Sequence, residues 1–144
     1  KEKFLGGFIM AVIVWDNTLS VDISAVDQQH KKLINIINEL HDAMKIGKAK
    51  DVMEKVIKEL VDYTVEHFSI EEKKMQEFHY VDYVQHKSEH DQFVKKAASL
   101  QKDFSTGKTS ITLDTMNFLK EWLTNHIMGT DKKYIPCFHE HNFK

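Results

Sequence analysis

The chain has 144 residues, and 42% of them are hydrophobic, which is enough for one domain with one core and too little to suggest two. Twenty basic and twenty-two acidic residues alternate in short clusters and leave a formal net charge of −2, so no basic stripe can follow a phosphate backbone and nucleic acid is not expected as a partner. The single cysteine, Cys137, cannot form an internal disulfide, which fits a reducing compartment and predicts a cytoplasmic location.

The first residues, KEKFLGGFIMAVIVW, have a charged start followed by an apolar run. This run is too short to span a bilayer, and no A-x-A-like cleavage site follows it, so neither membrane insertion nor a secretory signal is expected. Met10 stands inside the run, which suggests that the natural chain starts there. We therefore expect residues 1–9 to be a leader or an expression remnant, not native to the protein, and residues 10–144 to form a single domain.

After this arm, apolar residues recur every three or four positions in four segments, which is the spacing of amphipathic helices. These helices are expected at approximately 26–44, 52–75, 83–104 and 112–127. Asp51 and Asp82 stand where they could cap the second and third helices, and Pro136 is expected beyond the last helix. Four helices joined by short links predict an all-α fold, an up-down-up-down antiparallel four-helix bundle with an N-terminal arm and a short C-terminal tail.

Each predicted helix carries at least one histidine on its apolar stripe, where the side chain would face the bundle axis. Together with two acids at or just beyond the stripes, the set consists of His30, His67, Glu71, His86, His90, His126 and Asp131. Five imidazoles cannot lie in an apolar core unless their nitrogens find partners, because each unpaired polar nitrogen costs on the order of 1–3 kcal/mol. The individual spacings are common, but their combination on all four helices favours a metal site in the core.

The number and type of these ligands indicate which metal is expected. Seven ligands exceed what one tetrahedral zinc ion can use, so two ions bridged by the carboxylates are expected, and imidazoles with bridging carboxylates suit a pair of iron ions. The ferritin-like type of di-iron bundle needs Glu-x-x-His on two helices. This sequence contains no such motif. Ferroxidase or oxygenase chemistry of that class is therefore not expected.

Four segments carry a family resemblance: VDQQHKKL around His30, HFSIEEKKM around His67, QHKSEHDQF around His86 and His90, and WLTNHIMGTD around His126. They resemble, in order, the signature segments of the hemerythrin family, bacterial single-domain type, from about Trp15 to Pro136. The resemblance implies an up-down bundle, of which myohemerythrin is a standard example. It also implies a cofactor of two non-haem iron ions with an oxo or hydroxo bridge, and reversible dioxygen binding for transport, storage or delivery.

The resemblance further implies a role for each candidate ligand. His86, His90 and His126 would bind one iron ion. His30 and His67 would bind the other and leave it one open coordination position for dioxygen, while Glu71 and Asp131 would bridge the two ions. The oxygen pocket would be lined by large apolar side chains that can equally be read as ordinary core residues: Phe68, Trp122, Leu123 and Ile127.

The other acids and histidines are not expected to join this site. Glu72 is turned away from the apolar stripe and should be solvated, His41 lies too far along its helix, and His139 and His141 should lie in a solvated tail. An oxygen-binding protein is favoured over an enzyme, with an oxygen-consuming enzyme as a candidate partner. Two alternatives remain open: a di-iron redox enzyme acting on peroxide or nitric oxide, and an oxygen-sensing module.

Overall fold

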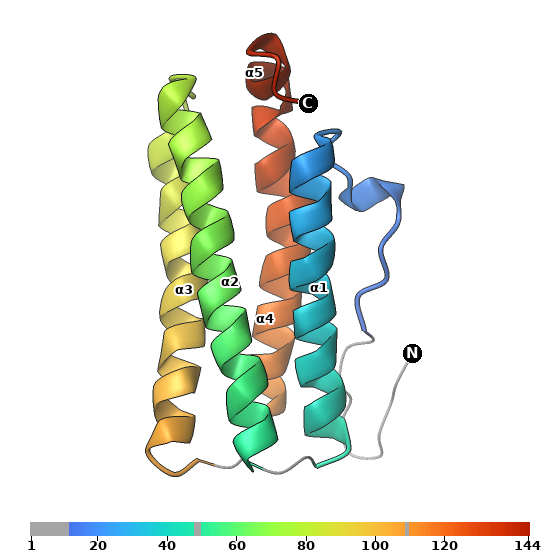
Figure 1. Cartoon of the computed structure of the whole chain (residues 1–144), viewed down its shortest axis with the longest axis vertical. Coiled ribbons are helices and arrows are strands. Elements are labelled where there is room, and N and C mark those ends of the chain that lie inside the picture. Colours follow the sequence, from blue (N-terminus) through green and yellow to red (C-terminus); the bar gives the residue numbers. More distant parts are fainter. Residues whose placement is uncertain (1–11, 48–49, 109) are drawn as a thin grey trace.

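The computed structural model describes residues 12–47, 50–108 and 110–144. Four long helices stand side by side and alternate in direction (Figure 1): α1 (Ser24–Lys45), α2 (Lys50–Glu77), α3 (Tyr83–Ser105) and α4 (Leu113–Asn125). Neighbours contact one another in the cyclic order α1, α2, α3, α4. The predicted all-α, up-down-up-down four-helix bundle is confirmed, and the described ranges contain no strand.

The N-terminal arm is anchored along α1 from residue 12 onward (Figure 1). On α1, the Asn38 side chain donates a hydrogen bond from Nδ2 to the Ile13 carbonyl at 2.8 Å and accepts one from the Ile13 amide at 2.9 Å. Further along the arm, which includes the short turn η1 (Asn17–Leu19), Val21 and Ile23 are fully buried. The predicted arm is confirmed over these residues, whereas the expectation for residues 1–9 falls outside the described part of the chain.

The first three helices end close to the predicted positions, but neither predicted aspartate cap forms: Asp82 stands at the N-cap position of α3 without a side-chain capping hydrogen bond. α1 is followed by Gly47 with a φ of +68°, a left-handed conformation that ends a helix most easily at glycine. The prediction that Asp51 caps the second helix is wrong, because α2 already includes Lys50 and Asp51 lies in its first turn. There its carboxylate still interacts favourably with the positive end of the helix dipole.

The largest difference from the prediction lies after α4. The chain remains helical through a π-helical turn, η2 (His126–Thr130), a 3-10 turn, η3 (Asp131–Tyr134), and a short helix, α5 (Ile135–Glu140). The expectation that Pro136 lies beyond the last helix is therefore wrong. Pro136 occupies the start of α5, where the amide hydrogen that proline lacks has no helical partner in any case.

The predicted solvated tail is accordingly a folded segment at the end of the bundle. Phe138 of α5 is fully buried, and its ring stacks on Tyr134 at 4.1 Å between ring centroids. His139 is half-buried and donates a hydrogen bond from Nε2 to the Asp22 carbonyl at 2.7 Å, so it is bound to the N-terminal arm. His141 remains exposed but stacks on Phe78 at 4.5 Å.

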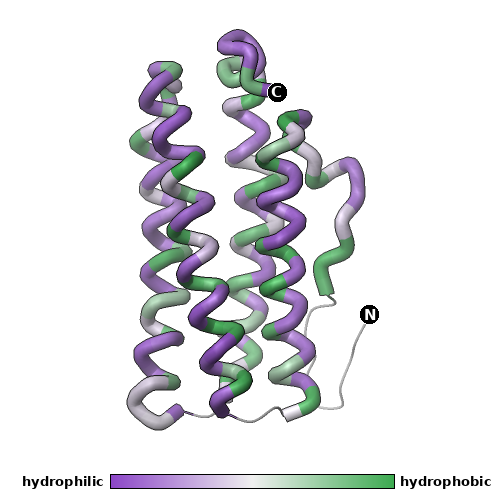
Figure 2. The backbone as a smooth tube through the Cα atoms, viewed as in Figure 1, coloured by the Kyte–Doolittle hydropathy of each residue, from purple (hydrophilic) through white to green (hydrophobic). Residues whose placement is uncertain are grey.

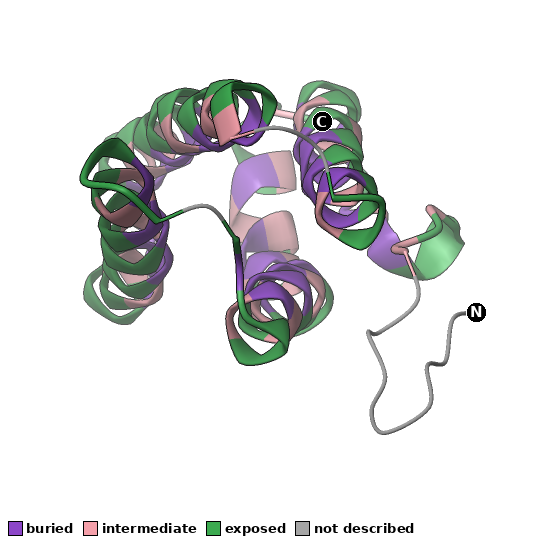
Figure 3. Cartoon of the chain, turned by 90° about the horizontal axis from the view of Figure 1, so that it is seen from below, coloured by how far each residue is buried: buried purple, intermediate pink, exposed green. Residues whose placement is uncertain are grey.

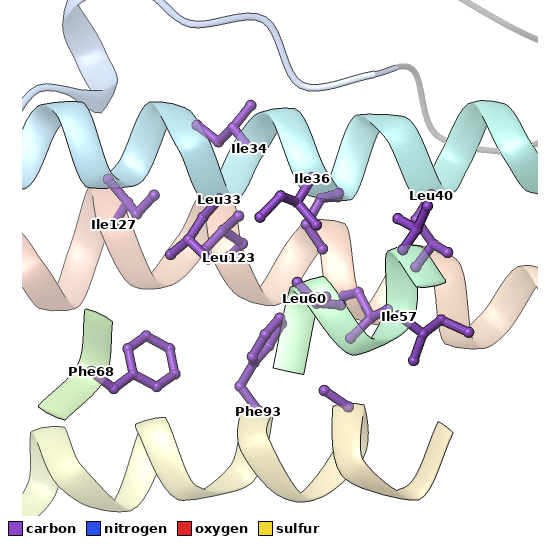
Figure 4. Packing of buried hydrophobic residues seen from close by; sticks show 14 of the residues in the cluster. Leu33, Ile34, Ile36, Leu40, Ile57, Leu60, Phe68, Phe93, Leu123 and Ile127 are labelled. Carbon is purple, nitrogen blue, oxygen red and sulfur yellow. The ribbon is translucent and has the colours of Figure 1, made fainter. Parts of the chain in front are cut away.

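Hydrophobic residues recur between hydrophilic ones along each helix (Figure 2), and the buried residues face the middle of the bundle (Figure 3). Figure 4 shows part of this core, where Leu33 of α1, Leu60 of α2, Phe93 of α3 and Leu123 of α4 point into the space between the helices. Full burial of one such side chain stabilises the fold by roughly 1.5–3 kcal/mol. Among the described helices, none combines the length and the apolar character required to cross a lipid bilayer.

Candidate metal centre

The alternating helix directions bring the predicted ligands to one end of the bundle. His30 lies near the start of α1 and His86 near the start of α3, and both positions are next to the end of α2 and the turns that follow α4. All predicted ligands come together there, and each is at most 3% exposed: His30, His67, Glu71, His86, His90, His126 and Asp131. A buried cluster of this size forms because α1, α2, α3 and the turn that follows α4 all place histidines at the same end of the bundle.

The donor atoms form two groups that share one carboxylate. The first group contains Glu71, His86, His90, His126 and Asp131. The second contains His30, His67 and Glu71, and within each group the donor atoms lie within 4.8 Å of one another. Each group therefore has the compactness that a bound metal ion requires, and the shared carboxylate of Glu71 places the two groups side by side.

Asp131 also faces both groups. Its Oδ1 lies 3.0 Å from His86 Nε2 and 3.0 Å from His126 Nε2, while its Oδ2 lies 3.1 Å from His30 Nε2. Glu71 is arranged in the same way, with Oε1 3.2 Å from His90 Nε2 and 3.5 Å from His67 Nε2. Each of these two carboxylates therefore lies close to imidazoles of both groups.

The π-helical turn explains how Asp131 reaches the cluster. Residues five apart, such as His126 and Asp131, would point about 140° away from each other on a regular α-helix with 3.6 residues per turn. In η2 the Asp131 amide donates to the carbonyl of His126, so the turn is one residue wider and both side chains face the centre. Single π-helical turns of this kind occur frequently at functional sites.

Several buried polar atoms of the cluster have no hydrogen-bond partner within the described residues: His67 Nε2, His90 Nε2, Glu71 Oε1, and both Oδ1 and Oδ2 of Asp131. Each such atom would cost about 1–3 kcal/mol if it stayed unsatisfied, because it has lost its contact with water. All of them are good metal donors and point toward one another. The chemistry of these residues therefore fits a metal centre.

Three of the histidines are oriented by hydrogen bonds at their outward nitrogen. Nδ1 of His67 lies 2.6 Å from Gln29 Oε1, and Nδ1 of His90 lies 2.8 Å from Glu72 Oε2. With an acceptor at Nδ1, the proton stays on that nitrogen and Nε2 presents its lone pair to the centre. The expectation that Glu72 is solvated is wrong. Glu71 points into the centre, and Glu72 points about 100° further around α2, where its carboxylate reaches His90 on the adjacent helix α3.

Glu89 provides the same contact for the third histidine. Its Oε1 lies 2.9 Å from His126 Nδ1 and also accepts a hydrogen bond from Thr130 Oγ1 at 2.7 Å. Burial disfavours the charge on Glu89, but the hydrogen bonds from Thr130 and His126 outweigh this effect and lower its pKa. The sequence reading missed Glu89, although its place directly before His90 resembles that of Glu72 directly after Glu71.

Tyr134 was also missed and lies fully buried beside the cluster. Its hydroxyl donates a 2.5 Å hydrogen bond to Glu71 Oε2, and its ring stacks on His86 at 5.6 Å. Burial and the nearby carboxylates of Glu71 and Asp131 raise the pKa of Tyr134 well above its usual value, so the hydroxyl remains a donor. Its spacing of three residues from Asp131 could have indicated a side chain on the same face.

The carboxylates control the protonation of the imidazoles before a metal ion binds. Burial by itself would lower the pKa of His30 and His90, but the carboxylates that lie close to their ring nitrogens favour the charged form more strongly and raise each pKa to about 9. At His67, burial dominates and lowers the pKa to about 4. Metal binding at neutral pH must therefore displace protons from His30 and His90, since an imidazolium has no lone pair to donate.

Two of the four predicted pocket residues, Phe68 and Trp122, stack on histidines of the cluster. Phe68 stacks on His90 with ring centroids 3.7 Å apart, and Trp122 stacks on His126 at 4.4 Å. Leu123 and Ile127 are 2% and 0% exposed and belong to the hydrophobic core, one turn before His126 and directly after it along the chain. Phe68 and Trp122 form an apolar wall against two histidines of the centre, and Leu123 and Ile127 lie next to Trp122 and His126 in the sequence.

His41 lies apart from the two donor groups, as expected from its position along α1. It is more buried than its sequence context suggested, at 0% exposure, and its Nδ1 lies 3.0 Å from the equally buried Lys120 Nζ on α4. This pair belongs to the packing between α1 and α4 below the centre.

Comparisons with known proteins agree with this arrangement. Residues 21–138 match the family model described as the hemerythrin HHE cation binding domain. The chain is 39% identical to a bacteriohemerythrin of Methylococcus capsulatus over 89% of this chain and 98% of that protein, and 37% identical to a hemerythrin-like protein of Naegleria gruberi over 83% and 88%, respectively. A crystal structure of wild-type hemerythrin superimposes with a TM-score of 0.82 at 38% identity, covering 88% of this chain and 98% of that one. Both the match along the sequence and the shared bundle identify the chain as a member of the hemerythrin family.

Proposed function

We propose that the buried cluster binds two iron ions and that the protein binds dioxygen reversibly at this centre. The observation that carries the proposal is the pair of donor groups that share Glu71 and both face Asp131. A single tetrahedral ion would leave several of these buried donors without a partner, whereas two ions can use all of them. Imidazole and carboxylate donors are compatible with iron.

The same distances support a division of the ligands. His86, His90 and His126 would bind one iron ion and His30 and His67 the other, and Glu71 and Asp131 would serve both. The second ion would then have one protein ligand fewer, which would leave a position for dioxygen. When bound, the iron pair would supply this open position and the two electrons that reversible dioxygen binding requires.

The protein side chains would protect this chemistry by excluding water. Phe68, Leu123 and Ile127 are apolar and each at most 3% exposed, so these side chains are closed to bulk water. A dry, apolar wall slows the entry of water and protons that would release the ligand as peroxide. This role favours an oxygen-binding protein over a redox enzyme.

We also propose a domain organisation, a location and a biological role for the protein. One hydrophobic core runs from Leu19 to Phe138, which supports a single domain over residues 10–144. We expect a cytoplasmic location because the chain has a single cysteine. Transport, storage or delivery of dioxygen, with an oxygen-consuming enzyme as the recipient, is the proposed role.

An optical titration tests the function directly. The metal-free protein is loaded anaerobically with ferrous iron, exposed to air and then flushed with argon while the visible charge-transfer bands are recorded. Binding of two iron ions per chain, with bands that appear in air and disappear under argon over repeated cycles, is the expected result. Irreversible conversion to a diferric form in the first cycle, or rapid turnover of added peroxide or nitric oxide, would contradict reversible oxygen binding.

A further inference from the structure

The outward nitrogens of the cluster histidines meet different chemical groups in the two donor groups. In the group with three histidines, His90 bonds to the carboxylate of Glu72 at 2.8 Å and His126 to the carboxylate of Glu89 at 2.9 Å. In the group with two histidines, the corresponding partner of His67 is the neutral amide oxygen of Gln29 at 2.6 Å. Within the described residues, Nδ1 of His30 and Nδ1 of His86 have no hydrogen-bond partner.

The positions of these partners are built into the helices. Gln29 precedes His30, Glu72 follows Glu71, and Glu89 precedes His90, so each partner is adjacent in sequence to a residue that points into the centre. Neighbours on a helix point about 100° apart, which lets one side chain face the centre while the next one reaches the histidine of an adjacent helix. Glu72 thus connects α2 to α3, and Glu89 connects α3 to η2.

Both acids remain partly accessible to water at these positions. The Glu72 side chain is 17% exposed and the Glu89 side chain 29% exposed, so neither is completely removed from water. Glu89 is also fixed in orientation, since Thr130 donates a hydrogen bond to the same oxygen at 2.7 Å. A charged and oriented acceptor at Nδ1 makes the imidazole a stronger donor at Nε2 than an amide acceptor does.

We infer that Glu72 and Glu89 are positioning residues that make the three-histidine group the tighter iron site, so that it fills first and favours the ferric state more than the other group. This inference rests on the proposed function, because it concerns the same two ions. Two carboxylates contact outward Nδ1 atoms in one group and none contacts an outward Nδ1 atom in the other, and negative charge beside a ligand stabilises the positive charge of the ion.

The competing explanation is that the acids only hold the helices together. Glutamine in place of either glutamate distinguishes the two, because its amide oxygen can still accept the hydrogen bond from Nδ1 while the charge is lost. A purely structural contact would survive this change. The reciprocal variant Gln29→Glu adds the missing charge to the two-histidine group.

The test is an anaerobic titration with ferrous iron against a competing chelator, which resolves the two binding events. For Glu72→Gln and Glu89→Gln we expect about tenfold weaker binding of the first ion with the second unchanged, and for Gln29→Glu tighter binding of the second ion. The reduction potential of the first site should rise as well, because loss of the negative charge weakens the binding of ferric iron more than that of ferrous iron; each further tenfold loss of ferric over ferrous affinity raises the potential of a one-electron couple by about 59 mV. Glu59→Gln, at an exposed position of α2 away from the centre, is the matched control and should behave like the unmodified protein.

The outcomes separate this inference from the proposed function. If the unmodified protein fails to bind two iron ions, the proposed function is wrong. The inference is overturned, and the proposed function stands, if the unmodified protein binds two ions and both glutamine variants bind the first ion with an affinity within twofold of it and with the same reduction potential. Circular dichroism of each metal-free variant verifies folding, and Gln29→Glu alone decides the question if neither glutamine variant folds.

Discussion

Replacing Tyr134 with phenylalanine would remove one hydroxyl from the centre and leave the ring in place. The ring stacks on Phe138 at 4.1 Å and on His86 at 5.6 Å, and phenylalanine can keep both contacts. The hydroxyl donates to Oε2 of Glu71, a residue whose pKa is held well below its usual value because the surrounding histidines outweigh burial and the repulsion of Asp131. The variant therefore removes a hydrogen bond to a buried, ionised carboxylate.

The expected loss of stability follows from the charge and the burial of this contact. A hydrogen bond to a charged group contributes about 1.5–3 kcal/mol, and the variant has no hydroxyl to replace it. In a domain of this size, 1 kcal/mol corresponds to roughly 2–4 °C in Tm, so Tyr134→Phe should lower the Tm of the metal-free protein by about 5–10 °C at pH 7. Differential scanning calorimetry measures this shift.

Tyr80 offers a matched control at the same end of the bundle. Its ring is 8% exposed and packs edge-to-face against Tyr134 at 6.4 Å, and its hydroxyl has no hydrogen bond recorded within the described ranges. Tyr80→Phe should change the Tm by less than about 2 °C. Equal shifts in the two variants, or an unchanged Tm for Tyr134→Phe, would refute the assignment of the stabilisation to the contact with Glu71.

Three further results are expected. Leu123→Ala should speed the autoxidation of the oxygenated protein, measured as decay of its visible bands, because it opens the apolar wall beside His126; an unchanged rate would argue against a gating role for Leu123. The metal-free protein should lose stability to urea between pH 7 and 9.5, since His30 and His90 have folded pKa values of about 9, above about 6.5 in the unfolded chain, and their stabilising contribution is fully present only below the lower value. A flat profile over this range would contradict the pairing of these histidines with the carboxylates. Removing iron with a chelator should lower the Tm, because an ion at one hundred times its Kd contributes about 2.7 kcal/mol, and an equal Tm with and without iron would mean that the folded centre does not bind it.

The helices and the inward histidines could be predicted because both depend on local periodicity. A stripe that repeats every three or four residues indicates a helix and the face that it buries, and this argument placed His30, His67 and His86 on inward faces correctly. The prediction failed for Asp51 and Pro136, which lie inside helices near their starts. Helix ends depend on only a few residues and are therefore less strongly encoded than helix faces.

By itself, the sequence determined four amphipathic helices and the set of imidazoles and carboxylates on their buried faces. The packing of the helices brings Asp131 into the centre and places Glu72 and Glu89 against the histidines. Periodicity at 3.6 residues per turn cannot show the π-helical turn that rotates Asp131 toward His126, nor which helix lies within reach of Glu72 and Glu89. The physical reason is that a pattern along one helix specifies which face turns inward, whereas the partner of each side chain depends on residues brought next to it by packing between helices.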